Sequence, residues 1–192
     1  TMNLNNFTIK SQEAIQHAFQ IAQGNNQQAI EPAHIMRGLL HSAENVIGFL
    51  LKKLDVNISI FQQALDKIIE SFPKVSGGEP YLSNTSNQVL QKALGLAQEM
   101  GDQYVSVEHI LLALLEAKDT TSRLMTDNGI SKKDLRLAIE ELRKGSKVDS
   151  QTAEDKSNLL NRFAINLNER ARNGKLDPVI GRDDEIRRIL QI

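Results

Sequence analysis

Residues 34–40 read HIMRGLL, and residues 109–115 read HILLALL. The similarity extends beyond these stretches. When residues 7–40 are placed over residues 82–115, a shift of 75, ten of the 34 positions are identical. A fixed offset of this size is typical of a supersecondary unit that occurs twice in one chain.

The repeat continues after one gap. FLLKKLDVNISIFQQAL, residues 49–65, matches RLMTDNGISKKDLRLAI, residues 123–139, at a shift of 74. The sequence therefore predicts repeat one at 7–73 and repeat two at 82–145, within one domain spanning 2–145. The connection FPKVSGGEPYLS holds two prolines and two glycines, which is typical of a loop.

Each copy has the periodicity of amphipathic helices. Apolar residues recur at i, i+3, i+4 and i+7 at Ile15, Ala18, Phe19 and Ala22, and again at Leu90, Ala93, Leu94 and Ala97. The paired alanines predict a close contact between helices. Second helices are expected at EPAHIMRGLL and VSVEHILLALL, where Pro32 suits a first helical turn and Ser106 an N-cap.

Two more helices are expected in each copy, at 45–54 and 58–71, then at 120–128 and 131–144. No segment alternates with period two, so we expect eight helices and no sheet in this part. The fold class is all-α, a pseudo-two-fold tandem repeat of two four-helix units.

Composition excludes several classes of function. The net charge of −1 lacks the basic excess that drives binding to nucleic acid. The chain has no cysteine, which excludes disulfides and thiolate chemistry. The apolar runs are too short for a membrane span, and the N-terminal stretch lacks the apolar region of a signal peptide. We take Met2 as the natural start.

The polar stretch GSKVDSQTAEDK predicts a linker, placed at 146–157. A helical pattern resumes after it, and the chain finishes with GKLDPVIGRDDEIRRILQI, residues 174–192. A turn containing Asp177-Pro178 and Gly181 leads there into a charged helix. We expect residues 158–192 to be the truncated start of a further domain. This tail is expected to be frayed, because its apolar residues lack the core against which they would pack.

These residues resemble a known family. The double repeat, with FTIKSQEAI in copy one and GDQYVSVEHILLALL in copy two, is similar to the N-terminal domain of Clp/Hsp100 AAA+ unfoldases. The tail looks like the entry into their first ATPase domain, an α/β AAA+ domain. AEDKSNLL resembles the linker of the disaggregase (ClpB-type) branch.

The resemblance implies that Val179 and Ile180 lie beside adenine in an intact protein that binds ATP and Mg. The chain holds no G-x-x-x-x-G-K-[ST], the loop whose backbone amides cradle phosphates. We therefore expect no cofactor and no enzymatic activity in this fragment.

The resemblance also implies a role in handling substrate for Thr8, Asp102 and Glu108. Each has a structural alternative. Thr8 suits the N-cap of the first helix, Asp102 follows a turn glycine, and Glu108 lies in a first helical turn, where the dipole favours it.

A substrate groove at the seam between the copies is the physical alternative. Exposed apolar residues there would hold an unfolded segment without reading its sequence. The candidates are Phe7, Leu90, Leu94, Tyr104 and Val105, although Leu90 and Leu94 also lie on the predicted core stripe.

The histidines are expected to be structural. His34 and His109 occupy equivalent positions, which favours partly buried residues with a hydrogen bond. His17 and His41 have no partner at ligand spacing, so we expect no metal site. No residue is marked as a catalytic nucleophile.

The resemblance implies a domain that engages exposed apolar segments of misfolded or aggregated protein. The intact family member is a cytoplasmic homohexamer that hydrolyses ATP, threads substrate through its pore and works with the DnaK chaperone system. The fragment is expected to be a monomer with no nucleic-acid or membrane partner. Two alternatives stay open: docking of a folded adaptor, as in protease-partnered Clp unfoldases, and a mobile structural cap of the ring.

Overall fold

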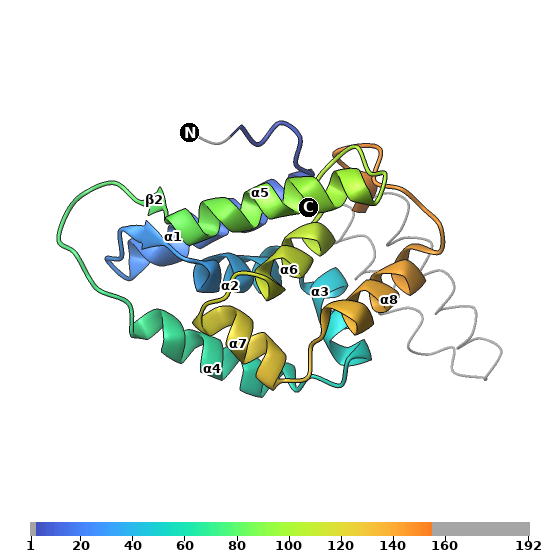
Figure 1. The fold of residues 1–192 in the computed structure, drawn as a ribbon. Helices are drawn as coiled ribbons and strands as arrows, with labels where there is room; N and C mark the ends of the chain where they lie inside the picture. The colour runs from blue at the N-terminus through green and yellow to red at the C-terminus, as the bar shows by residue number, and fades with distance from the viewer. Residues whose placement is uncertain (1–2, 155–192) are drawn as a thin grey trace, which may run out of the picture.

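The computed structural model describes residues 3–154, which form eight helices and two very short strands (Figure 1). Repeat one contains α1 (Ile9–Gly24), β1 (Ala29–Ile30), α2 (Pro32–Ser42), α3 (Glu44–Lys53) and α4 (Ile58–Glu70). Repeat two contains β2 (Tyr81–Leu82), α5 (Asn84–Glu99), α6 (Val107–Leu115), α7 (Thr120–Asp127) and α8 (Lys132–Arg143). The predicted all-α double repeat with four helices in each copy is confirmed.

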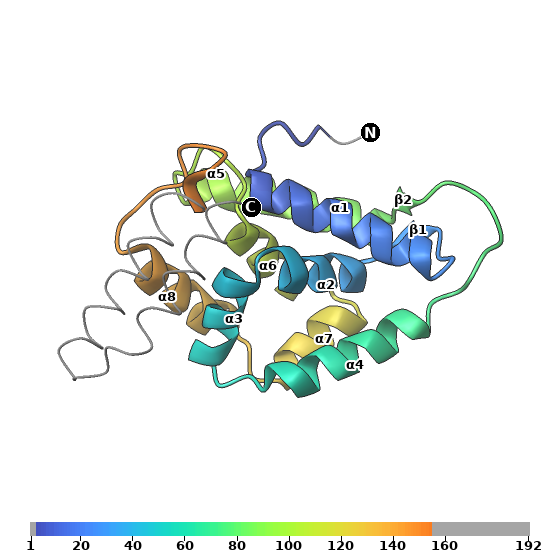
Figure 2. The same ribbon diagram turned by 180° about the vertical axis from the view of Figure 1, so that it is seen from behind.

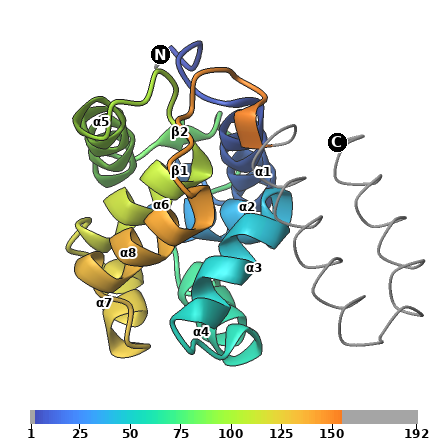
Figure 3. The same ribbon diagram turned by 90° about the vertical axis from the view of Figure 1, so that its right-hand side faces the viewer.

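The first two helices of each copy lie at the same level as their equivalents, α1 with α5 and α2 with α6, whereas the third helix of each copy, α3 or α7, lies beside the fourth helix of the other copy, α8 or α4. Figures 1 and 2 show α1 and α5 on one side, α2 and α6 in the middle, and α4 and α7 on the opposite side. Figure 3, seen from one end, shows α3 and α8 together at that end. Contacts between the members of each pair α2–α6, α4–α7 and α3–α8 join the copies into one body.

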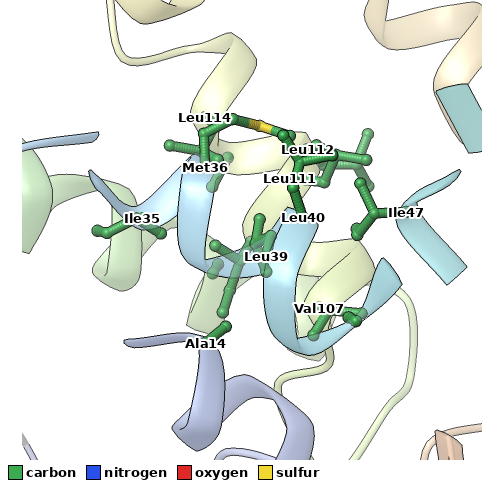
Figure 4. Close-up of a cluster of buried hydrophobic side chains, with 14 of the residues drawn as sticks. Ala14, Ile35, Met36, Leu39, Leu40, Ile47, Val107, Leu111, Leu112 and Leu114 are labelled. Carbon is green, nitrogen blue, oxygen red and sulfur yellow. The ribbon is translucent and has the colours of Figure 1, made fainter. Parts of the chain in front are cut away.

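The centre of the core is built by α2 and α6. Most residues of both helices are buried, including polar ones, so both lie inside the molecule rather than at its surface. Figure 4 shows side chains of the two helices facing each other, with Leu39 and Leu40 of α2 near Leu111 and Leu112 of α6. All four of these leucines are buried.

The predicted helix contact through small residues is confirmed. Ala18, Ala22, Ala93 and Ala97 are all buried. Gly38 of α2 lies so close to α1 that an added Cβ would clash with the backbone oxygen of Ala14. This close approach explains why α1 and α2 share the most extensive contact between any two helices of the described part.

The prediction that the repeats contain no sheet is wrong in a limited way. Ala29 and Ile30 of repeat one pair in parallel with Tyr81 and Leu82 of repeat two. A single parallel bridge makes the reciprocal connection: it joins Phe7, at the start of repeat one, to Val105, between the first two helices of repeat two. Stretches of two residues are too short to show a period of two, so sequence patterning could not reveal them.

Serine side chains reinforce this exchange. The Oγ of Ser86 donates to the backbone oxygen of Ile30 at 2.7 Å. The Oγ of Ser11, the equivalent residue, donates to the backbone oxygen of Val105 at 2.9 Å. The start of each copy is therefore held by the other copy, and neither copy has all its hydrogen bonds by itself.

Candidate functional site

Asp102 and Glu108, two of the predicted substrate residues, meet at the guanidinium of Arg143 in the last turn of α8. The Nη1 atom of Arg143 lies 2.6 Å from Oδ2 of Asp102. Its Nε and Nη2 atoms lie 2.8 and 2.6 Å from Oε2 of Glu108. All three side chains are buried, so the three charges form one ion cluster inside the protein.

His109 completes the cluster and fixes its neutral tautomer. Its Nδ1 accepts a hydrogen bond from the backbone N–H of Ser106 at 2.9 Å, and its Nε2 donates to Oδ2 of Asp102 at 2.8 Å. Ser106 is the N-cap of α6, as predicted, and its Oγ donates to Glu108 at 3.2 Å. One histidine thus caps a helix and orients a carboxylate at the same time.

The cluster keeps its charges despite burial. Burial by itself opposes ionisation of Asp102, but hydrogen bonds from His109, the backbone N–H of Val148 and Arg143 hold its pKa well below the usual range. Burial also opposes the charge of Arg143, and the neighbouring Glu108 and Asp102 outweigh it and raise the pKa of the guanidinium. The site is a buried ion cluster in which two carboxylates share one guanidinium, and it joins α8 to the turn before α6 and to α6 itself.

Repeat one builds a related arrangement in which the side-chain partner of the histidine is uncharged. His34 replaces His109, with Nδ1 accepting from the backbone N–H of Glu31 at 2.9 Å and Nε2 donating to Oε1 of Gln27 at 2.7 Å. Burial without a charged partner lowers the pKa of His34 to about 4, so this ring stays neutral at pH 7. The hydrogen bonds predicted for His34 and His109 are present, but both rings are fully buried rather than partly buried.

Thr8 is buried at the start of α1. Its Oγ1 accepts from the backbone N–H of Ser11 at 3.2 Å, which confirms the predicted N-cap. Ser83 has the same role at the start of α5. The side chain of Thr8 is fully occupied within the fold, so any effect of Thr8 on substrate must act through the position of α1.

Three of the predicted groove residues do not line a groove. Phe7, Leu90 and Val105 are buried in the core, because the strand exchange draws Phe7 and Val105 inward and Leu90 lies on the inner face of α5. The expectation that their side chains are exposed is therefore corrected. Leu94 and Tyr104 are half-buried, and Leu94 packs on the core.

An apolar pocket does lie at the seam, but other residues form it. It has a volume of about 420 Å³ and is lined by Leu4, by Ile15 and Phe19 of α1, by segment 80–82 and by Asn87 of α5. The internal repeat could have indicated this position, because Ile15 and Phe19 are the equivalents of Leu90 and Leu94. Nothing in the local sequence could have indicated Leu4 or Tyr81, which the tertiary fold brings to the seam.

The predicted linker is docked on the domain as far as residue 154. Val148 and Ala153 are buried. The backbone N–H of Val148 donates to Oδ1 of Asp102 at 3.0 Å, and Oε2 of Glu154 accepts from the backbone N–H of Val107 at 3.1 Å. The polar composition of this segment suggested free chain, whereas the fold supplies partners for its polar groups.

The predicted adenine residues Val179 and Ile180 lie outside the described residues, as does the predicted truncated ATPase start. Within residues 3–154 no three histidine or acidic side chains are grouped so that they could hold a metal ion. In the same part of the chain, no helix has the length and apolar content needed to cross a membrane.

Comparisons with known proteins agree on one family. The profile described as the Clp repeat (R) N-terminal domain matches residues 6–128. The chain is 61% identical over 191 residues to the chaperone protein ClpB of Bacteroides thetaiotaomicron and 53% identical to that of Porphyromonas gingivalis. Each match covers 100% of this chain and 22% of the relative, so the chain spans about a fifth of the length of these curated relatives.

The fold is also found among solved structures. The N-terminal domain of Hsp104 from Candida albicans superposes with a TM-score of 0.69 at 25% sequence identity. The superposition covers 78% of this chain and 99% of that domain. The ion cluster and the seam pocket therefore belong to a fold that has been observed in a related domain.

Proposed function

Because the chain belongs to the Clp repeat (R) N-terminal domain family and is of the ClpB type, we propose that it is a substrate-engaging domain. It binds exposed apolar segments of misfolded or aggregated proteins and presents them to an ATPase ring that follows it in the intact protein. The intact protein is an ATP- and Mg-dependent homohexameric disaggregase in the cytoplasm, working with the DnaK chaperone system.

The seam pocket is the observation that carries this proposal. Its lining is mostly apolar, and its volume of about 420 Å³ falls within the range of pockets that hold small ligands or a few side chains. Burial of apolar area is non-directional, so such a pocket accepts many sequences. With so small a contact we expect a Kd of roughly tens of micromolar to millimolar.

Weak binding suits a domain that must release its substrate as well as capture it. The net charge of −1 gives the chain no general attraction for polyanions. Specificity would therefore come from exposed apolar surface, which is what distinguishes unfolded protein from folded protein.

The test is a titration of the chain with a permanently unfolded, apolar-rich polypeptide, followed by NMR. We expect saturable shifts at Leu4, Phe19, Tyr81 and Leu82. Tyr81→Asp should weaken binding at least about fivefold, because it places a charge in the pocket. Leu137→Asp on α8 is the matched control, since Leu137 and Tyr81 are both 55% exposed.

Three outcomes distinguish the candidate functions. Loss of binding in Tyr81→Asp alone supports the seam pocket. Equal loss in both variants, or shifts elsewhere, refutes the pocket. An absence of shift changes at millimolar polypeptide, together with tight binding of a folded adaptor, would favour the adaptor-docking alternative. No binding of either ligand would favour a structural cap.

A further inference from the structure

We propose that residues 146–154 form a releasable latch, and that the docked latch holds residues 3–7 against the seam pocket. Residues 3–7 are called the strap below. The inference rests on the proposed function in one respect, because it concerns the regulation of the same pocket. Its test is chosen so that it does not require a bound polypeptide.

The latch docks first on the turn between α5 and α6. The backbone N–H of Val148 donates to Asp102, and the backbone oxygen of Val148 accepts from the N–H groups of Gln103 at 2.9 Å and Tyr104 at 3.3 Å. Lys147 adds a bond from Nζ to the backbone oxygen of Met100 at 2.8 Å. Val148 is thus held through both its backbone N–H and its backbone oxygen.

The latch then reaches the strap through one residue. The backbone oxygen of Gln151 accepts from the N–H of Ile9 at 2.9 Å. Its Nε2 lies 2.9 Å from the backbone oxygen of Asn5 and 3.4 Å from that of Phe7. Figure 3 shows this orange segment beside the dark blue N-terminal segment.

The strap in turn forms part of the pocket wall. Leu4 lines the pocket, and its backbone oxygen accepts from Nε2 of Gln12 at 3.1 Å and from the N–H of Phe7 at 3.0 Å. A continuous series of contacts therefore runs from the chain that follows the domain, through Gln151 and Asn5, to Leu4 in the pocket.

The latch can undock from the domain while the helices of the domain stay folded. Its buried side chains are Val148, Ala153 and Glu154, of which only the first two are apolar, and Glu154 is held by a hydrogen bond from the N–H of Val107. The latch leaves α8 at Lys144 and Gly145, whose φ angles of 49° and 88° mark a sharp change of direction at the helix end. A segment with few buried apolar contacts opens at low cost compared with the core.

Release also leaves no buried charge without a partner. When the N–H of Val148 departs, Asp102 keeps its hydrogen bonds from His109 and Arg143. The ion cluster is therefore complete with or without the latch, and Asp102 acts as a positioning residue for the latch.

Release has a consequence at the far end of the contact series. Once Gln151 leaves Asn5 and Phe7, the strap is held only by Gln12 of α1, by Val105 and by the buried side chain of Phe7, so Leu4 is less firmly fixed at the pocket. A pull on the chain beyond residue 154 would then both lengthen the tether and widen access to the pocket.

The chain itself provides two reporters, because Tyr81 and Tyr104 are its only tyrosines. Tyr81 lines the pocket and Tyr104 binds the latch. The complete chain would be labelled with 3-fluorotyrosine, the two ¹⁹F signals assigned by Tyr→Phe variants, and the spectra compared with those of Val148→Ser. Val75→Ser, at an exposed valine in the inter-repeat loop, is the matched control.

We expect Val148→Ser to shift both ¹⁹F signals and Val75→Ser to shift neither. The amides of Gln103, Ile9 and Val107, whose acceptors lie on the latch, should exchange at least about tenfold faster in Val148→Ser, while the amides in the interior of α6 stay protected. A shift of Tyr104 without a shift of Tyr81 would overturn the coupling between latch and pocket. Unchanged signals and unchanged exchange would overturn the latch itself.

A second variant covers the case in which Val148→Ser unfolds the domain. Gln151→Ala removes the two side-chain bonds to the strap and leaves the docking of Val148 intact. The Tyr81 signal should move and the Tyr104 signal should not, and a Tyr81 signal that stays in place refutes the proposal. These readouts concern the free chain, so a failure of polypeptide binding would count against the proposed function alone.

Discussion

Arg143 and Ile69 occupy the same position in the two repeats, and each completes the buried hydrogen-bond system of its own copy in a different way. The guanidinium of Arg143 binds Asp102 and Glu108. The backbone oxygen of Ile69 accepts from Nε2 of Gln27, the equivalent of Asp102, at 2.5 Å. One fold position thus carries an ion cluster in repeat two and a neutral contact in repeat one.

The first prediction concerns the ion cluster. Asp102→Asn removes one partner of a buried pair, so the free energy of unfolding should fall by about 3 kcal/mol, measured by urea denaturation. The matched control is Lys53→Ala, which breaks an exposed pair with Glu141 at 2.9 Å and should cost less than about 1 kcal/mol.

Repeat one suggests a compensating variant. A triple variant, Asp102→Gln, Glu108→Ala and Arg143→Ile, transfers the equivalent residues of repeat one and should recover at least half of the loss, because no buried charge then lacks a partner. A triple variant less stable than Asp102→Asn would show that the charges themselves are needed.

The second prediction concerns the close approach of α1 and α2. Gly38→Ala places a Cβ against the backbone oxygen of Ala14, so the two helices must separate. The free energy of unfolding should therefore fall by about 1–3 kcal/mol. Gly48→Ala in α3 is the control, since its added Cβ meets no atom within 4 Å. That variant should gain up to about 1 kcal/mol from helix propensity, and a stabilised Gly38→Ala would contradict the packing.

The third prediction concerns stability at acid pH. The pKa of His34 is about 4 in the folded protein, below its ordinary value of 6.5, so the unfolded chain takes up the proton first. Its contribution to stability is complete above pH 6.5 and is lost as the pH falls towards 4. Between these limits, the free energy of unfolding should fall by roughly 2–3 kcal/mol more in the unmodified chain than in His34→Gln.

The measurement is a series of urea unfolding curves from pH 7 to pH 4. Val75→Ser is the control, because it changes an exposed side chain that does not titrate and should follow the unmodified chain. Parallel curves for His34→Gln and the unmodified chain would show that His34 does not titrate in this way.

The fourth prediction separates capping from substrate handling at Thr8. Thr8→Ala should cost about 1 kcal/mol of stability through loss of the N-cap, and Ser83→Ala, which removes the equivalent cap, should cost a similar amount. If Thr8 has only this role, both variants should bind an unfolded polypeptide equally well. A selective loss of binding in Thr8→Ala, at equal stability, would assign Thr8 a part in substrate handling.

Much of this protein could be predicted from local pattern. The offset of 75 between HIMRGLL and HILLALL predicts two copies of one unit, and the period of the apolar residues predicts helices, because each reflects contacts between residues a few positions apart. The N-caps Thr8 and Ser106 were predictable for the same reason, since a cap depends on the residues immediately after it.

The functional geometry depended on contacts distant in the sequence. The burial of Asp102 and Glu108 follows from Arg143, which lies 41 and 35 positions away, and no periodicity links them. The docking of residues 146–154 follows from backbone groups that the strand exchange leaves available near Val105 and Phe7. The amino-acid sequence by itself determined the repeat and its helices, because those follow from short-range spacing. Only the tertiary structure decided which polar groups are buried together and which apolar groups stay open at the seam, because both depend on how the two copies pack.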